Sequence, residues 1–264
     1  MDKRAEMAMT VVGLLALLLV MGIFFYWFFF ELAPWSEQGV GREACRDSVL
    51  LRTQVKIMGK TTLQDLSCTT DMIELSSSDE SEIKEVISGE LYDCWYQFAE
   101  GEKDFLSDYD WGNGDNYCFI CSRIDFGERV QENVPEIKDL VNYLGTEPLQ
   151  LHNGESFFEY MYDDHSNKIH SQEFSTDYST SEPFYVVFFA DKRFEFWDGG
   201  FSDISRLVST FAGGAWTGAK VGGAWGAVIG GVGSTALTKT STKTGFVSGL
   251  YFGSGEEVIG ACNQ

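Results

Sequence analysis

Cysteines are the residues of this sequence with the greatest capacity for chemistry. Six are present, namely Cys45, Cys68, Cys94, Cys118, Cys121 and Cys262. An even number of cysteines in a domain outside the reducing cytosol favours disulfide bonds, whose connectivity the sequence does not define. Cys45 and Cys68 lie close in sequence and flank a segment with strand-like alternation. We therefore expect these two to pair, and the other four to pair among themselves.

Cys118 and Cys121 form a C-x-x-C motif, which is typical of redox pairs and of half a metal site. A thioredoxin-like motif begins a helix near a βαβ unit, whereas both flanks of this motif resemble strands. A zinc site needs a second pair at similar spacing, and only Cys94 and Cys262 remain for it. We expect structural disulfides here and retain a thiol-redox or metal-binding enzyme as an alternative.

Other groups that could bind or react carry weaker signals. Asp163–His165 and His170 could bind a metal, but a spacing of five residues does not place the two histidines on one helix face. The acidic pair Glu100 and Glu102 is expected to be ordinary surface. Motifs of serine hydrolases, zinc proteases and nucleotide-binding loops do not occur. We therefore predict a non-enzymatic protein with no catalytic residue, metal or cofactor.

An uncharged run, Met7–Phe30, opens the chain after a short polar stub. A run of this length forms a helix of roughly 36 Å, enough to cross a hydrocarbon core of about 30 Å. It is too long for a cleavable secretory signal. Lys3 and Arg4 precede it and Glu31 follows it, which predicts a single-pass signal anchor with a cytoplasmic N-terminus and an extracellular main domain. Pro34 is expected to end the helix.

The stub Lys3-Arg4-Ala5-Glu6-Met7 resembles the class III signal of archaeal type IV pilin-like membrane proteins. The resemblance implies cleavage between Ala5 and Glu6, with the apolar helix retained. In that family the helix usually continues as a stalk into the head domain, and the expected stop at Pro34 departs from this pattern.

Charge and composition limit the classes of partner. The formal net charge is −21, and such a surface repels phosphate backbones, so nucleic-acid binding is not expected. The aromatic fraction of 15% argues against disorder. The expected partners are a lipid bilayer and other proteins, including further copies of the chain.

Periodicity beyond the predicted anchor indicates an α+β domain with a mostly antiparallel sheet. Alternation and β-branched residues predict strands at 46–57, 117–126 and 184–197, with a closing strand or hairpin after 245. Apolar residues at three- and four-residue spacing, together with capping residues, predict helices at 83–98, 133–144 and 155–162.

Glycines recur every four residues near the C-terminus, at Gly214, Gly218, Gly222, Gly226 and Gly230. Residues four apart share a helix face, so a helix here would carry a smooth groove that another helix could approach. The segment resembles the glycine-zipper segments of membrane-associated proteins. It suggests, as an alternative function, a membrane-active protein that forms pores or oligomers.

These observations predict four parts. They are a stub and transmembrane anchor (1–35), an α+β exported domain stabilised by disulfides (36–206), a helical glycine-zipper segment (207–244) and C-terminal strands that return to the exported domain (245–264). The predicted function is that of a membrane-anchored cell-envelope protein that acts by assembly or interaction, in its more specific form pilin-like.

The resemblance at the N-terminus predicts a processed chain. If a peptidase cuts between Ala5 and Glu6, the protein isolated from its native host should begin at Glu6 and retain the whole apolar run. Intact-mass spectrometry measures this directly. A mature chain that still begins at Met1 would contradict the resemblance.

Overall fold

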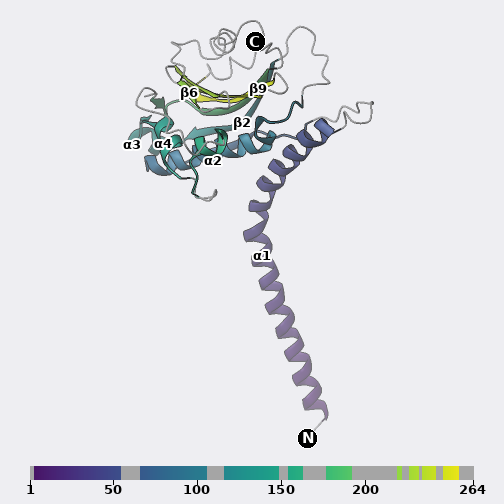
Figure 1. Ribbon diagram of the computed structural model, residues 1–264. Helices are drawn as coiled ribbons and strands as arrows, with labels where there is room; N and C mark the ends of the chain where they lie inside the picture. Colours follow the sequence, from purple (N-terminus) through teal and green to yellow (C-terminus); the bar gives the residue numbers. More distant parts are fainter. Residues whose placement is uncertain are drawn as a thin grey trace. The chain divides into compact units, whose positions relative to one another are not determined.

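The computed structural model divides the chain into two compact units, Met1–Glu43 and Ala44–Gln264, which we call unit 1 and unit 2. The structure describes residues 3–54, 66–105, 116–148, 154–162, 177–191, 219–221, 226–231, 234–241 and 246–255. Unit 2 is an α+β domain, in agreement with the sequence pattern. Its helices and strands are drawn in Figure 1.

The N-terminal helix α1 (Lys3–Gln54) is continuous over 52 residues. Pro34 lies inside it, so the prediction that Pro34 ends the helix is wrong. A proline in a helix removes one backbone hydrogen bond, and the bonds made by the residues on both sides are sufficient to continue this helix. Ala5 and Glu6, which flank the predicted processing site, lie in its first turns.

The strand predicted at 46–57 is also wrong over residues 46–54, which belong to α1. The buried side chains of this segment are Cys45, Ser48, Val49 and Arg52. They recur three or four residues apart, which is the spacing of one helix face. Packing of that face within unit 2 outweighs the β-branched residues that suggested a strand.

The membrane assignment requires correction. Within the ranges given above, the structure contains no helix that is both long enough and apolar enough to cross a membrane. A crossing needs about 20 consecutive, predominantly apolar residues in one helix. The predicted transmembrane helix, signal anchor and single-pass topology are therefore wrong, and the predicted localisation, with a cytoplasmic N-terminus and an extracellular main domain, loses the spanning helix on which it rested.

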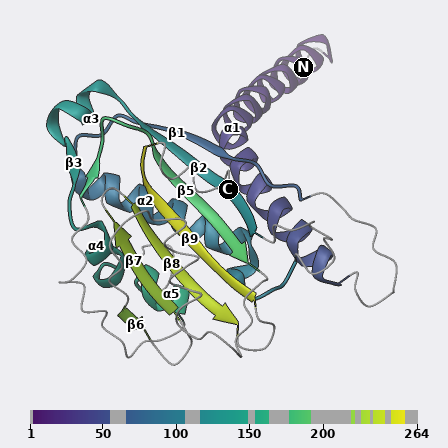
Figure 2. The ribbon, with the colours of Figure 1, turned by 90° about the horizontal axis from the view of Figure 1, so that it is seen from above.

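The main sheet of unit 2 has seven strands in the order β1-β2-β5-β9-β8-β7-β6. The strands are β1 (Asp71–Leu75), β2 (Asn116–Phe126), β5 (Phe184–Asp191), β6 (Ala219–Val221), β7 (Gly226–Gly231), β8 (Ser234–Ser241) and β9 (Phe246–Ser254). β1 runs parallel to β2, and the other neighbouring pairs are antiparallel. The sheet is therefore mixed, and Figure 2 shows the C-terminal strand β9 between β5 and β8.

β5 is an interior strand of the sheet, between β2 and β9, and its side chains are buried on both faces. Phe184, Val186 and Phe188 belong to the main core cluster, while Val187 and Phe189 point to the other face and are also buried. A run that is apolar at successive positions is typical of such a strand. The register sets β5 against β2 on one side and β9 on the other.

A β-bulge interrupts β2. Ile120 and Ser122 pair with consecutive residues of β5, so Cys121 between them is an extra residue. A bulge shifts the alternation of a strand by one position. Phe119 before the bulge and Ile124 after it therefore both pack with the core, although they are five positions apart and a regular strand would place them on opposite faces.

One face of the sheet is covered by helices, as Figure 1 shows for α2 (Glu80–Gln97), α3 (Glu128–Asn133) and α4 (Leu140–Thr146). α2 begins as the sequence indicates. Asp79 is its N-cap, and its carboxylate accepts a hydrogen bond of 2.9 Å from the backbone N–H of Ser81.

The helix predicted at 133–144 is wrong in its first half. Asn133 ends α3 instead of capping a new helix, and a short strand β3 (Glu136–Ile137) follows. β3 pairs with β4 (Tyr178–Ser179), so a partner more than 40 residues away decides the local state. After α4, the helix α5 (Phe157–Tyr162) lies within the range predicted for it.

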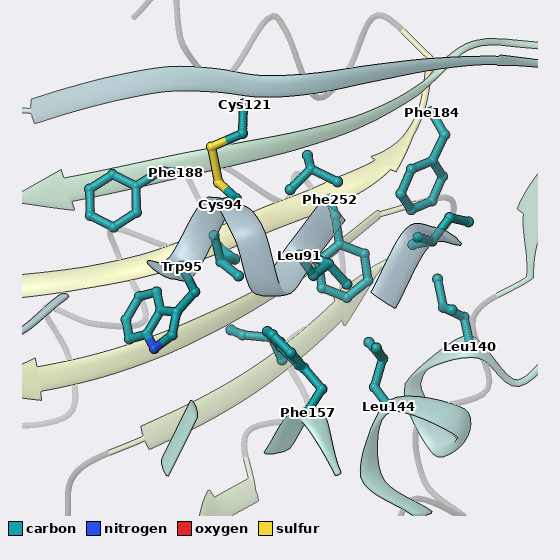
Figure 3. Packing of buried hydrophobic residues seen from close by; sticks show 14 of the residues in the cluster. Leu91, Cys94, Trp95, Cys121, Leu140, Leu144, Phe157, Phe184, Phe188 and Phe252 are labelled. Carbon is teal, nitrogen blue, oxygen red and sulfur yellow. A yellow bond between two sulfur atoms is a disulfide. The ribbon is translucent and has the colours of Figure 1, made fainter. Parts of the chain in front are cut away.

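Aromatic packing between α2 and the sheet forms the centre of the core (Figure 3). Phe98 follows α2 and stacks on Phe188 of β5, with 4.0 Å between the ring centroids and 12° between the ring planes. Trp95 and Leu91 lie one and two turns earlier on the same face of α2 and are fully buried. Apolar contacts of this kind supply most of the stability of a domain.

The glycine ladder is not a helix where the structure describes it. Gly226 and Gly230 lie in β7, so the predicted helical zipper is wrong at these positions, and Gly214, Gly218 and Gly222 lie outside the described residues. Residues four apart share a face in a strand as well as in a helix. Glycine opposes helix by about 1 kcal/mol relative to alanine, and β7 finds hydrogen-bond partners in β6 and β8.

Truncation of Phe188 tests the importance of the α2–sheet contact. We expect Phe188→Ala to lower the free energy of unfolding by about 3–5 kcal/mol, because it empties a fully buried site against Phe98. Urea denaturation with the disulfides intact measures the change. Met72→Ala on β1, where the side chain is 63% exposed, is the control and should alter stability by less than about 0.5 kcal/mol.

Candidate functional site

The structure uses the predicted disulfide candidates to join elements of unit 2. Cys45 bonds to Cys68, the pair preferred from sequence proximity, with a Cα–Cα distance of 4.4 Å. Cys94 of α2 bonds to Cys121 of β2, with a Cα–Cα distance of 5.6 Å. Cys118 is also disulfide-bonded.

The C-x-x-C motif does not close on itself, because Cys121 pairs with Cys94 and not with Cys118. The bulge in β2 explains the geometry, since it turns Cys121 toward α2. None of the cysteines among the described residues is free, and Cys262 lies outside them. A reactive or metal-binding thiolate at this motif would first require reduction of these bonds.

The acidic and histidine candidates of the sequence lie elsewhere. Asp163–His165 and His170 are outside the described residues. The residues that the structure does describe include no group of three or more potential metal ligands.

A girdle of exposed apolar side chains surrounds part of unit 1. We call it the apolar girdle, and it consists of Leu14, Leu17, Leu18, Leu19, Val20, Met21, Ile23, Phe24, Phe25, Tyr26 and Trp27. These side chains are between 49% and 68% exposed. Exposed apolar side chains are ordinary when they are scattered, but a contiguous group of this kind marks an interaction surface.

A second cluster surrounds the carboxylate of Glu100. We call it the Glu100 clamp, and it consists of Arg46, Tyr92, Tyr96, Glu100 and Tyr160. The Arg46 guanidinium lies 3.3 Å from Glu100 Oε1, donates a hydrogen bond to the carbonyl oxygen of Tyr96, and stands 3.9 Å from the centre of the Tyr96 ring. The Tyr160 hydroxyl donates to the same Glu100 oxygen at 3.3 Å. The clamp thus joins α1, α2 and α5.

A left-handed turn places Glu100 in this cluster. Ala99, Glu100 and Gly101 have φ values of 52°, 57° and 64°. The left-handed region costs a non-glycine residue about 1 kcal/mol or more, and such strain persists only where surrounding contacts hold it. Gly101 is required here, because a Cβ would lie 2.1 Å from Ser248 Oγ and 2.4 Å from the Trp95 ring.

Burial and charge favour the neutral form of the clamp tyrosines. Burial raises the pKa of Tyr160, and the negative charge of Glu100 raises it further. Burial likewise raises the pKa of Tyr92, whose ring lies 4.5 Å from that of Tyr160. The hydroxyl of a neutral Tyr160 donates a hydrogen bond to Glu100, so this hydrogen bond persists across the neutral pH range.

An acidic hollow of about 590 Å³ lies between α2 and α4. Glu80, Lys84, Glu85, Tyr143 and Glu147 line it. Burial alone would raise the pKa of Glu80, but hydrogen bonds from Lys84 and from the backbone N–H of Lys138 outweigh this effect and lower the pKa. The pKa of Tyr143 is raised by burial and by the charges of Glu85 and Glu147.

Together these features define an α+β protein whose first helix carries an exposed apolar surface. Disulfide bonds and the partly buried Glu100 clamp join the elements of its unit 2. Comparison with known proteins found no matching family model, no similar curated protein and no similar solved structure.

Sequence reasoning did not find the Glu100 clamp. Glu100 was expected to be ordinary surface, and its partners Arg46 and Tyr160 are 54 and 60 residues away. The one local signal was Gly101, a plausible helix stop. A glycine after a helix allows a left-handed turn, but it does not identify the side chain that the turn presents.

The raised tyrosine pKa predicts a loss of stability at alkaline pH. A Tyr160 pKa above its ordinary value of 10.0 contributes stability that is complete below this pH and is lost as the pH rises above it, because the unfolded chain then releases its proton first. Tyr160→Phe should be less stable at neutral pH, where the bond to Glu100 is lost. Its stability should also fall less steeply between pH 10 and about 12. Urea denaturation over this range measures both effects, and parallel stability–pH curves would contradict the assignment.

Proposed function

We propose that this protein is a non-enzymatic, pilin-like assembly subunit, in which the apolar girdle of α1 packs against the same helix in further copies of the chain. The observation that carries the proposal is the exposure of eleven large apolar side chains, each at least 49% exposed, on one helical segment. Burying this surface is favourable by roughly 25 cal/mol per Å² of apolar area removed from water.

The distribution of the girdle around the helix favours several partners over one. Ala16–Trp27 is an unbroken series of exposed residues. Because successive helical residues turn by about 100°, these side chains point in every direction around the axis over roughly 18 Å. A single partner helix covers one stripe, as in a two-stranded coiled coil. A helix that is apolar all round needs several neighbours, as in the core of a helical assembly.

The length of α1 supports the pilin-like form of the proposal. The sequence departed from that family at Pro34, where the helix was expected to stop before the head. Instead, α1 continues to Gln54, and its last turns belong to unit 2. A helix that begins in a separate apolar unit and ends within an α+β domain agrees with the pilin-like resemblance of the N-terminal stub.

Electrostatics also directs assembly to α1. The chain carries a net charge of −21, so two copies repel each other over most of their surfaces. Ala16–Trp27 contains no charged residue, and contact there avoids bringing carboxylates together. The acidic remainder of the chain would then limit contact between domains and leave the helices as the main site of association.

Charge placed in the girdle tests this proposal. We expect the wild-type chain to assemble, and Leu18→Asp with Phe25→Asp to reduce the assembled fraction at least about ten-fold, because each carboxylate would have to be buried among apolar helices. Sedimentation velocity measures the assembled fraction, and negative-stain microscopy shows its form.

Met72→Asp is the matched control for this experiment. It adds one carboxylate of the same kind, where the girdle variant adds two, at a large apolar residue that is 63% exposed but lies on β1 of unit 2. It should assemble as the wild type does. The proposal fails if the girdle variant assembles normally, or if Met72→Asp is equally defective.

A further inference from the structure

We propose that the last turns of α1, residues 44–54, are held in unit 2 by two independent fasteners, the Cys45–Cys68 disulfide and the Glu100 clamp. We call this attachment of residues 44–54 the joint, and it opens only when both fasteners are released. The inference rests on the proposed function for its purpose, because a subunit that assembles through α1 needs a defined connection between that helix and its domain. The two fasteners themselves are observed contacts within unit 2.

The position of the fasteners in the chain is the first argument. Unit 2 begins at Ala44, and the next two residues are Cys45 and Arg46. One is bonded covalently and the other is held by the clamp. Both fasteners therefore hold residues at the very beginning of unit 2.

The Cys45–Cys68 disulfide is the fastener that reduction can break. Cys68 is partly exposed, whereas Cys94 and Cys121 of the second described bridge are 0% and 2% exposed. A dithiol reductant can therefore attack Cys68 Sγ, breaking the Cys45–Cys68 bond and forming a mixed disulfide. Its second thiol then displaces Cys68, so that the dithiol is oxidised to a disulfide and its two protons pass to the cysteine thiolates.

The clamp does not depend on the disulfide. Arg46 is held by a carboxylate, a carbonyl oxygen and an aromatic ring, none of which belongs to the loop that the disulfide closes. Tyr160 supports the carboxylate from α5, and the left-handed turn fixes the backbone of Glu100. Hydrogen bonds to ionised groups are the stronger ones, and this carboxylate takes part in two.

Other side chains of this segment also pack within unit 2. Val49 is fully buried one turn beyond Cys45, and the hydroxyl of Ser48 accepts a hydrogen bond of 3.0 Å from the backbone N–H of Ser67. The Ser67 contact lies beside Cys68 and belongs to the loop that the disulfide closes, whereas Val49 packs in the core cluster together with Cys45. Glu100 acts here as a positioning residue, because it holds Arg46 and through it the helix.

Hydrogen exchange on the full-length chain tests the inference. The readout is the exchange rate of the backbone amides of residues 47–54, with and without dithiothreitol, at a concentration where alkylation labels Cys45 and Cys68 only. Wild type should stay protected in both states, and Glu100→Ala should stay protected while oxidised. Reduced Glu100→Ala should exchange at least about ten-fold faster, because neither fastener remains.

Three comparisons make the test decisive. Glu102→Ala, at an exposed neighbouring carboxylate, should behave as wild type in both states. Arg46→Gln should reproduce Glu100→Ala, and Cys45→Ser with Cys68→Ser should reproduce reduction without a reductant. Fast exchange in reduced wild type would overturn the inference, because the disulfide would then be the only fastener. Continued protection in reduced Glu100→Ala would overturn it as well, as would alkylation of Cys94 and Cys121 before Cys45 and Cys68.

This test is separate from that of assembly. Exchange in residues 47–54 reports on contacts within unit 2, whereas the girdle variants report on association between copies. If the girdle variants assemble normally while the exchange pattern holds, the proposed function fails and the joint remains. If the exchange pattern fails while the girdle variants lose assembly, the joint fails and the proposed function remains.

Discussion

The packing of α2 on the sheet is the contact on which the rest of unit 2 depends. Phe98, which follows α2, stacks on Phe188 of the interior strand β5, and the Cys94–Cys121 bridge joins α2 to β2. Burial of this face orders α2, and α2 in turn carries Tyr92 and Tyr96 to the clamp. The domain therefore has one core, and this core positions both the sheet and the Glu100 clamp.

Two irregularities in the backbone serve this packing. The bulge at Cys121 shifts the alternation of β2, so that residues on both sides of it reach the core. The left-handed turn at Ala99–Gly101 ends the helical region tightly against Trp95 and Ser248, and it directs Glu100 toward Arg46. Strain of this kind is tolerated because the surrounding core determines the path of the chain.

Unit 1 and unit 2 satisfy different physical requirements. Unit 2 buries its large apolar residues in its own core, whereas the girdle of unit 1 leaves its own exposed. A contiguous exposed apolar surface of this kind is typical of interaction sites, and it is the surface on which the proposed assembly rests. In the sequence, unit 1 ends at Glu43, directly before the Ala44, Cys45 and Arg46 that begin unit 2.

By itself, the sequence determined those elements whose pattern is local. The cap at Asp79 and the helical stripe predicted α2, a strand-like sequence predicted β2, a continuous run of apolar and β-branched residues predicted β5, and short separation favoured the Cys45–Cys68 bond. These features depend on neighbours a few residues away, so that periodicity and capping are enough to reveal them.

Only the tertiary structure decided the elements whose local pattern is ambiguous. Residues 46–54 form a helix because burial on one face outweighs strand propensity, and Gly226 and Gly230 lie in a strand because a four-residue spacing fits both states. Glu100 meets Arg46 and Tyr160 across 54 and 60 residues of chain. No local pattern encodes such a contact, since it exists only once the helices are packed.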